Sequence, residues 1–156
     1  MPVEVLAVPS SERNELWTMY QRYAHELAPM ANVVPVKGEI PAPDFGDFWQ
    51  KPRHWPFWAV LDGKRIGFAL IRFVPDMSAM QMAQFYIAPE YRRNDYGLAF
   101  ARAVIARHPG AWRIRQMAAN MAAVAFWRHV VEPYGYTETS FSHNGIDRVE
   151  QTLTVR

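Results

Sequence analysis

The chain has 156 residues, of which 50% are hydrophobic and 21% charged, and it contains no cysteine. This length and composition are typical of a single compact domain over residues 1–156. The net charge of +2 is too small to indicate a nucleic-acid-binding surface, and the lack of cysteine excludes disulfides and thiolate chemistry. We find neither a secretory leader nor an apolar run near the roughly 18 residues of a membrane span. We therefore expect a cytoplasmic protein that binds neither nucleic acid nor membrane.

The first part of the chain predicts a strand, a helix and a proline-rich loop. Residues 3–8 are typical of a strand, and apolar side chains at three- and four-residue spacing predict a helix over residues 12–28. Ser11 is the expected N-cap of this helix and Pro29 its expected end. Four prolines in residues 29–44 predict a loop.

A β-hairpin and a central strand are predicted next. Two β-rich runs within residues 57–75 are joined at Asp62-Gly63, a dipeptide that tolerates the positive φ angles of a tight turn. Residues 79–88 are apolar at both alternating sets of positions, which is typical of a strand covered on both faces.

Helices and strands alternate in the remainder of the chain. The predicted elements are a helix over 97–107, a strand over 112–117, a helix over 120–131, and an antiparallel pair, 135–141 and 147–155, around Asn144-Gly145. The complete order predicts an α/β (α+β) domain with helices on both faces of a central sheet.

The junction between the central strand and the next helix, residues 87–98, predicts an anion site. A loop that runs directly into a helix presents free backbone N–H groups and the positive end of the helix dipole. Arg92 and Arg93 add positive charge there, and we expect both side chains to face solvent. A pyrophosphate fits such a site, and the alternative is an ordinary solvated turn.

Two motifs in this region resemble those of the GCN5-related N-acetyltransferase (GNAT) family. Residues 91–99, YRRNDYGLA, resemble its acetyl-coenzyme A motif: Arg92 and Gly97 match, whereas Asp95 replaces the usual first glycine. Residues 120–127, NMAAVAFW, resemble its second motif, a helix with an asparagine, an alanine and two aromatic residues. Several further fragments resemble a bacterial subgroup of predicted acetyltransferases.

The resemblance implies a single GNAT-like domain whose mixed, mostly antiparallel sheet is splayed at its central strands. It implies acetyl-coenzyme A as the co-substrate, no metal, and a pantetheine arm bonded by free backbone groups of the central strand. The cofactor-binding residues that it implies are Phe85, Tyr86, Ile87, Arg92, Arg93, Asn94, Asp95, Tyr96, Gly97, Leu98, Ala99, Asn120, Ala123 and Phe126.

The family's usual proton-transfer residues are replaced in this chain. Trp127 stands where a tyrosine general acid is usual, and Gln84 stands where a glutamate base is usual. An indole N–H and an amide do not exchange protons at neutral pH, although glutamine can orient a water or an amine. The candidates left open are Gln84 and Tyr134 foremost, then Tyr136, His129, Glu132 and water. The alternative is hairpin packing for the two tyrosines and an exposed helix face for His129 and Glu132.

Trp49, Trp55 and Trp58 fall where the family has its variable substrate-side wall. Their rings suit a cationic or aromatic amine, and a core patch is the alternative. The resemblance thus implies acetyl transfer to a primary amine of a small molecule or a peptide, and a homodimer. The alternatives are a catalytically weak or inactive coenzyme A-binding module, and a subunit whose aromatic surface meets a partner protein.

Overall fold

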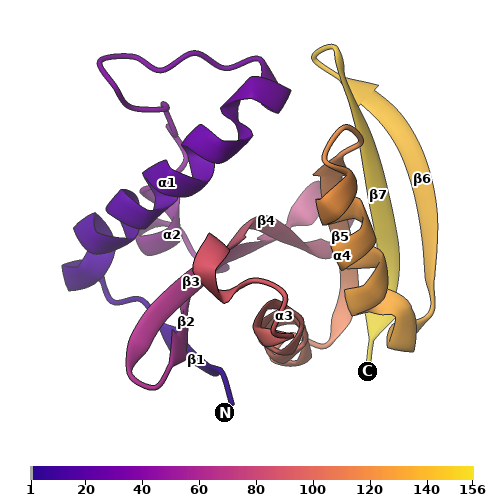
Figure 1. Ribbon diagram of the computed structural model, residues 1–156. Coiled ribbons are helices and arrows are strands. Elements are labelled where there is room, and N and C mark those ends of the chain that lie inside the picture. The colour runs from indigo at the N-terminus through magenta and orange to yellow at the C-terminus, as the bar shows by residue number, and fades with distance from the viewer. Residues whose placement is uncertain (1) are drawn as a thin grey trace.

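Seven strands form one mixed sheet in the computed structural model, which describes residues 2–156. The strand order is β1-β2-β3-β4-β5-β7-β6 (Figure 1). The strands are β1 (Glu4–Ala7), β2 (His54–Leu61), β3 (Lys64–Val74), β4 (Ala79–Ile87), β5 (Gly110–Met117), β6 (Tyr136–His143) and β7 (Ile146–Val155). The α-helices are α1 (Arg13–Ala31), α2 (Asp47–Gln50), α3 (Tyr96–Ala106) and α4 (Met121–Val131). Among residues 2–156, no helix is long and apolar enough to cross a membrane.

Both predicted hairpin turns are confirmed, and each has the backbone that its dipeptide favours. The two turn residues are left-handed in each hairpin, with φ of 51° and 74° at Asp62-Gly63 and of 51° and 75° at Asn144-Gly145. Two consecutive left-handed residues give the turn that matches the twist of the flanking strands. The first hairpin is longer than predicted, because β2 begins at His54.

The predicted start and end of the first helix are wrong. A 3₁₀ turn over Ser10–Glu12 precedes α1, and Ser11 makes no capping bond. Pro29 lies inside α1, which continues to Ala31. A proline this close to the helix end removes only one late hydrogen bond, and the left-handed Asn32 then closes the helix by donating its N–H to the carbonyl of Ala28.

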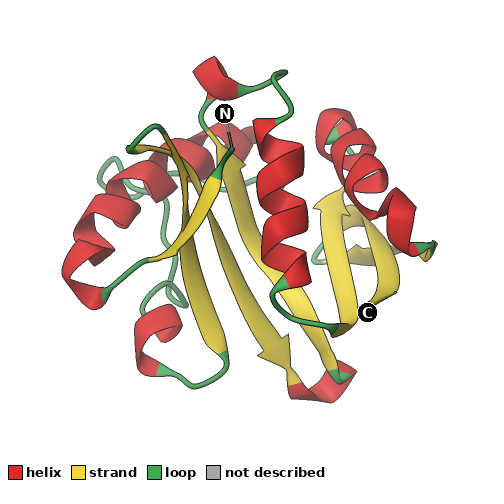
Figure 2. Ribbon diagram, turned by 90° about the horizontal axis from the view of Figure 1, so that it is seen from below, coloured by secondary structure: helices red, strands yellow, loops and turns green. Residues whose placement is uncertain are grey.

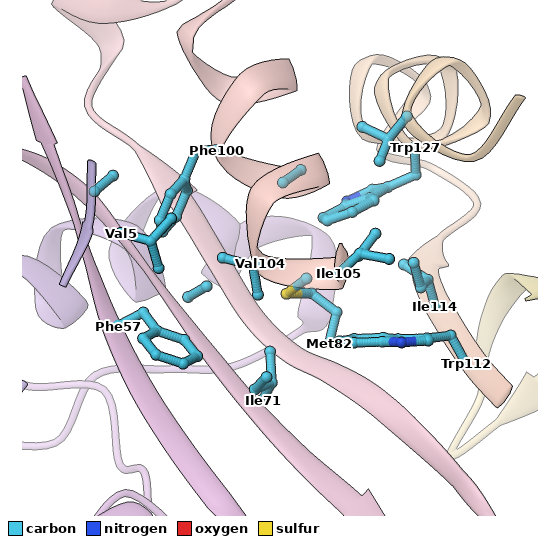
Figure 3. Packing of buried hydrophobic residues seen from close by; sticks show 14 of the residues in the cluster. Val5, Phe57, Ile71, Met82, Phe100, Val104, Ile105, Trp112, Ile114 and Trp127 are labelled. Carbon is cyan, nitrogen blue, oxygen red and sulfur yellow. The ribbon is translucent and has the colours of Figure 1, made fainter. Parts of the chain in front are cut away.

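The helices cover both faces of the sheet, as predicted (Figure 2). On one face α3 and α4 pack over a core that includes Phe100, Val104, Trp112 and Trp127 (Figure 3). On the other face α1 and α2 pack over a second core, whose members include Leu16, Phe48 and Phe68. Because β3 is covered on both faces, its central residues form a continuous apolar run.

The sheet is splayed between β4 and β5, which confirms the predicted fold class. Among the described residues 2–156 this is the only parallel pair of strands, and its register has just two matched positions, Met80 with Trp112 and Gln81 with Arg113. Beyond Gln81 the two strands diverge. A register shift in the β3–β4 pair leaves Ala83 without a partner residue near the start of the gap.

Candidate functional site

A pocket of about 440 Å³ occupies the gap between β4 and β5. Its walls come from α1, β4, β5, α4 and the β6–β7 hairpin, and Figure 1 shows the end of α1 facing that hairpin across the divergence. Because the strands have separated, the pocket reaches both faces of the sheet. One end adjoins α4, and the other end adjoins α1.

The end of the pocket beside α4 contains residues of the second sequence motif. Asn120, Ala123 and Trp127 line it together with Phe85 of β4. Asn120 accepts a hydrogen bond from the N–H of Ala123 at 3.2 Å, which caps α4 and fixes its first turn. Trp127 packs edge-on against Phe85, with ring centroids 4.9 Å apart. These contacts form a rigid apolar wall beside the stretch of β4 that pairs with β3 but not with β5.

The loop that joins β4 to α3 has the geometry of an anion site. Arg93 and Asp95 are left-handed, with φ of 66° and 61°, and Asp95 immediately precedes α3. The first backbone bond into the helix is from the N–H of Ala99 to the carbonyl of Asp95, at 3.0 Å. The N–H groups of residues 96–98 therefore have no acceptor within the helix, and they lie at the positive end of its dipole.

Gly97 brings this loop close to α4. A Cβ atom at this position would lie 3.3 Å from the ring of Phe126 and 3.4 Å from the side chain of Ile87. The missing side chain thus lets α3 begin directly beside the end of β4 and the aromatic ring of the second motif. The two motifs, separated in the sequence, are in contact in the fold.

Arg92 is exposed, as predicted, but its guanidinium is not free. Its guanidinium donates to both carboxylate oxygens of Glu26 in α1, at 2.7 and 2.8 Å, and its Nε donates to the carbonyl of Ile87 at 2.8 Å. Its charge lies 5.6 Å above the ring of Tyr86, which is itself buried. Arg92 thus ties the loop to α1 and occupies the carbonyl of Ile87, and Arg93 is exposed as well.

The end of the pocket beside α1 is polar. Tyr23 of α1 donates its hydroxyl to Oε1 of Gln84 at 2.5 Å, and both residues line the pocket. Burial raises the pKa of Tyr23 far above its usual value, so the phenol keeps its proton. With its oxygen held in place by Tyr23, the Gln84 side chain has the second lone pair of this oxygen left to accept and its amide N–H groups left to donate.

A family model described as "Acetyltransferase (GNAT) family" matches residues 14–130. The chain belongs to the GNAT acetyltransferase family. This membership indicates acetyl transfer from acetyl-coenzyme A. No curated protein matches the sequence.

Solved structures of other acetyltransferases have the same fold at low sequence identity. The ribosomal-protein-S18-alanine N-acetyltransferase of Escherichia coli is 17% identical with a TM-score of 0.68, and the match covers 98% of this chain and 94% of that one. An acetyltransferase from Thermus thermophilus is 13% identical with a TM-score of 0.72, over 99% and 98% of the two chains. The aminoglycoside acetyltransferase AAC(6')-Ib, in complex with coenzyme A and kanamycin, is 12% identical with a TM-score of 0.70, over 97% and 94%.

Several residues that the sequence suggested for this GNAT site lie away from the pocket. Tyr134 is in the 3₁₀ turn after α4 and lines a separate depression beside the start of β6. Trp58 is 2% exposed, and Trp49 donates to the carbonyl of Val8 at 2.9 Å, so both belong to the core around α1. Trp55 packs against His108 at 4.3 Å. The structure does not bring these three tryptophans together as a substrate wall.

Sequence reasoning missed most of the polar side chains that line the pocket, among them Tyr23, His143 and Arg148. Tyr23 lies in an apolar helical repeat and looks like a core residue from its spacing alone. His143 and Arg148 flank the β6–β7 turn, where polar residues are ordinary. No local pattern marks them, because it is the sheet order that brings this hairpin to the gap.

Proposed function

We propose that the protein is an N-acetyltransferase that transfers the acetyl group of acetyl-coenzyme A to a primary amine. One observation carries this proposal: the pocket through the splayed sheet joins the residues of the second motif at one end to the polar pair Tyr23 and Gln84 at the other. A thioester entering beside α4 thus meets an acceptor entering beside α1. Three expectations from the sequence remain predictions: that the protein is cytoplasmic, that it forms a single domain, and that it is a homodimer.

The coenzyme would bind along the residues that the two motifs supply. Backbone N–H groups at the start of α3 and the charge of Arg93 suit the pyrophosphate, and the unpaired edge of β4 suits the amides of the pantetheine arm. In this proposal Arg92 and Tyr86 hold the loop in place. The full cofactor set is Phe85, Tyr86, Ile87, Arg92, Arg93, Asn94, Asp95, Tyr96, Gly97, Leu98, Ala99, Asn120, Ala123 and Phe126.

Acetyl transfer to a neutral amine needs few reactive side chains in the pocket. The amine nitrogen attacks the thioester carbonyl carbon, the C–N bond forms and the C–S bond breaks, and water carries the proton lost by the nitrogen to the departing thiolate, which leaves as the thiol. Gln84 orients the amine by accepting its N–H at the second lone pair of the carbonyl oxygen, and the indole N–H of Trp127 suits a hydrogen bond to the departing sulfur. Among residues 2–156, the pocket is lined by no aspartate or glutamate, so the amine must bind in its neutral form.

A coenzyme A-binding module with little turnover is the second candidate. It is favoured by the same absence of a carboxylate from the pocket lining in the described residues, and by the position of Tyr134 outside it. The two candidates share the cofactor site and differ only in the rate of thiol release in the presence of amines.

Calorimetric titration of coenzyme A tests the shared part, with pantetheine as the analogue that lacks the pyrophosphate. We expect micromolar binding of coenzyme A and much weaker binding of pantetheine. Arg93→Gln should weaken coenzyme A binding by about tenfold and leave pantetheine unchanged, since it removes one charged contact. Lys64→Gln, at an exposed residue in the β2–β3 hairpin, is the matched control. Equal binding of both ligands, or an unaffected Arg93→Gln variant, would contradict the assignment of the loop.

A further inference from the structure

The acceptor end of the pocket contains positive charge that its surroundings do not fully neutralise. Arg115 and Arg148 line the pocket, and the lining within residues 2–156 includes no acidic side chain. The other polar members are Tyr23, Gln81, Gln84, Gln116, Asn120 and His143. A ligand that fills this space therefore meets hydrogen-bond donors and cations.

Arg115 already has its partner. Its Nε lies 2.5 Å from a carboxylate oxygen of Glu150, a residue of β7 that is only 6% exposed. Arg113 approaches the other oxygen of this carboxylate at 3.7 Å. The guanidinium of Arg115 also lies 4.8 Å above the ring of Phe141. The buried carboxylate is thus satisfied by its neighbours on β5.

Arg148 has no such partner. It lies opposite Met117 of β5 and Phe141 of β6, and it shares a face of β7 with Glu150 because side chains two positions apart in a strand lie on the same face. It forms no ion pair or side-chain hydrogen bond with any residue in the described part of the chain, and its Nε is buried without an acceptor. A buried charged donor without an acceptor is unfavourable, and an anionic oxygen would relieve it.

Gln84 adds a second polar group on another strand of the same pocket. Tyr23 holds its carbonyl oxygen in place by one hydrogen bond, and the second lone pair of this oxygen is left to accept an N–H of the amine. The pocket thus offers a guanidinium from β7 and an amide from β4 near the point where the acceptor amine must lie. A planar guanidinium matches the oxygens of a carboxylate or a phosphate, and the one unpaired guanidinium balances the single negative charge of a carboxylate.

We propose that the acceptor is a small primary amine with a carboxylate group, and that Arg148 binds the carboxylate while the amide of Gln84 orients the amine end. This inference rests on the proposed acetyl transfer. The volume of about 440 Å³ is shared with the thioester end of the coenzyme, so the acceptor has the size of an amino acid. A polycationic acceptor such as kanamycin, which is bound in the AAC(6')-Ib structure, would meet Arg148 without a compensating carboxylate.

A matched series of amines tests the inference. Phenylalanine, phenylalaninamide and phenethylamine differ mainly at the carboxylate, phosphoethanolamine replaces the carboxylate by phosphate, and kanamycin is the polycation. With acetyl-coenzyme A and a thiol-release readout, kcat/KM for the free acid should exceed that for its amide by about tenfold to hundredfold, the value of a charged hydrogen bond. A preference for the amide, the phosphate or the polycation would overturn the proposal.

Variants at Arg148 identify the residue responsible. Arg148→Gln should abolish the preference for the acid over the amide, and Arg148→Lys should retain part of it. Arg113→Gln removes a nearby arginine that does not line the pocket, so this variant should prefer the acid over the amide as strongly as the parent does. Coenzyme A affinity should stay unchanged in all three variants, which shows that they fold. An unchanged preference in a folded Arg148→Gln variant would overturn the assignment.

Direct binding separates failure of this inference from failure of the proposed function. The amine series is titrated into the protein with and without coenzyme A, and the heat of binding is measured. If coenzyme A does not bind, the proposed acetyl transfer is contradicted, and the preference of the pocket for a carboxylate is still measured by the titrations without coenzyme A. Equal affinity for the acid and the amide contradicts the carboxylate proposal, whether or not turnover occurs.

Discussion

At the scale of single residues, Asp95 combines a suitable backbone with an unsuitable charge. Its φ of 61° is left-handed, a conformation that aspartate tolerates better than most residues, and its side chain caps no N–H group. The carboxylate lies at the helix end where a pyrophosphate is expected, so the two negative charges repel. Asp95→Gly should tighten coenzyme A binding by about fivefold, as measured by calorimetry.

Asp95→Asn isolates the charge from the backbone effect. Asparagine also tolerates the left-handed region, so this variant should gain nearly the same affinity as the glycine variant. If neither substitution strengthens binding, the carboxylate does not lie near the pyrophosphate.

Tyr23 is a positioning residue for Gln84. Tyr23→Phe removes the hydroxyl that holds the amide oxygen, so the amide of Gln84 can rotate. We expect kcat/KM for the amine to fall by about tenfold, the value of a hydrogen bond between neutral groups, with no change in the KM for acetyl-coenzyme A. Steady-state kinetics on both substrates measures this split.

Two comparisons distinguish positioning from general packing. Tyr20→Phe alters a neighbouring tyrosine of α1 in the same aromatic cluster and should leave the kinetics unchanged. In a Gln84→Ala background, Tyr23→Phe should cause no further loss. A full additional loss in that background would show that Tyr23 acts independently of Gln84.

At the scale of elements, the pair Glu26–Arg92 fastens α1 to the loop before α3. The hydrogen bond from Arg92 lowers the pKa of Glu26 below its ordinary value of 4.5. A lowered pKa in the folded state stabilises the fold above the ordinary value, and this contribution disappears as the pH falls through the folded value. Since the Glu26 side chain is 41% exposed, we expect only about 0.5 kcal/mol at pH 7.

Urea unfolding of Glu26→Gln at several pH values measures this contribution. The variant should be less stable than the parent at neutral pH, and the difference should vanish in acid once Glu26 is protonated. Glu90→Gln is the control, since its contact with Arg22 is 3.8 Å long and more than half exposed on both sides. A stability difference that persists unchanged in acid would contradict this account of the ion pair.

Gly67 of β3 lies directly against the backbone of β4. A Cβ atom there would lie 2.0 Å from the carbonyl oxygen of Tyr86, so even alanine would force the backbone apart. We expect Gly67→Ala to destabilise the fold by about 3 kcal/mol in urea unfolding and to weaken coenzyme A binding, because β4 leads into the loop.

Gly46→Ala is the matched control for this close approach. Its nearest neighbour would be the Gln50 side chain at 3.9 Å, and its φ of −64° suits any residue. Its effect should stay within about 0.5 kcal/mol of zero. Similar losses in the two variants would mean that contact with Tyr86 is not the cause.

At the scale of the whole molecule, the parts predictable from sequence are those encoded by neighbouring residues. The two hairpin turns, the helix over residues 97–107 and the loop motif are each contiguous, and α3 at Tyr96–Ala106 differs from the prediction by one residue. Pro29 misled the prediction because a proline normally ends a helix, whereas here the next turn is closed by Asn32. Such a rescue depends on backbone geometry that composition does not reveal.

The acceptor end of the pocket could not be predicted in the same way. Tyr23 and Gln84 are 61 positions apart, and Arg148 reaches the gap only because β7 lies between β5 and β6 in the sheet. Arg92 shows the same limit, since its partner Glu26 is 66 positions away. Aromatic composition pointed instead to tryptophans that the fold uses in its cores.

The divergence of β4 and β5 also sets the kinetics of amide hydrogen exchange across the middle of the sheet. Beyond Gln81, the N–H groups of β4 that point away from β3 have no carbonyl on β5 to bond. In the free protein they should exchange much faster than their neighbours that bond β3, as resolved by NMR or mass spectrometry. Saturating coenzyme A should slow the amides of residues 82–87 selectively, and uniform protection of β4 without ligand would contradict the open gap. One central strand would thus have a protected edge and an exchanging edge.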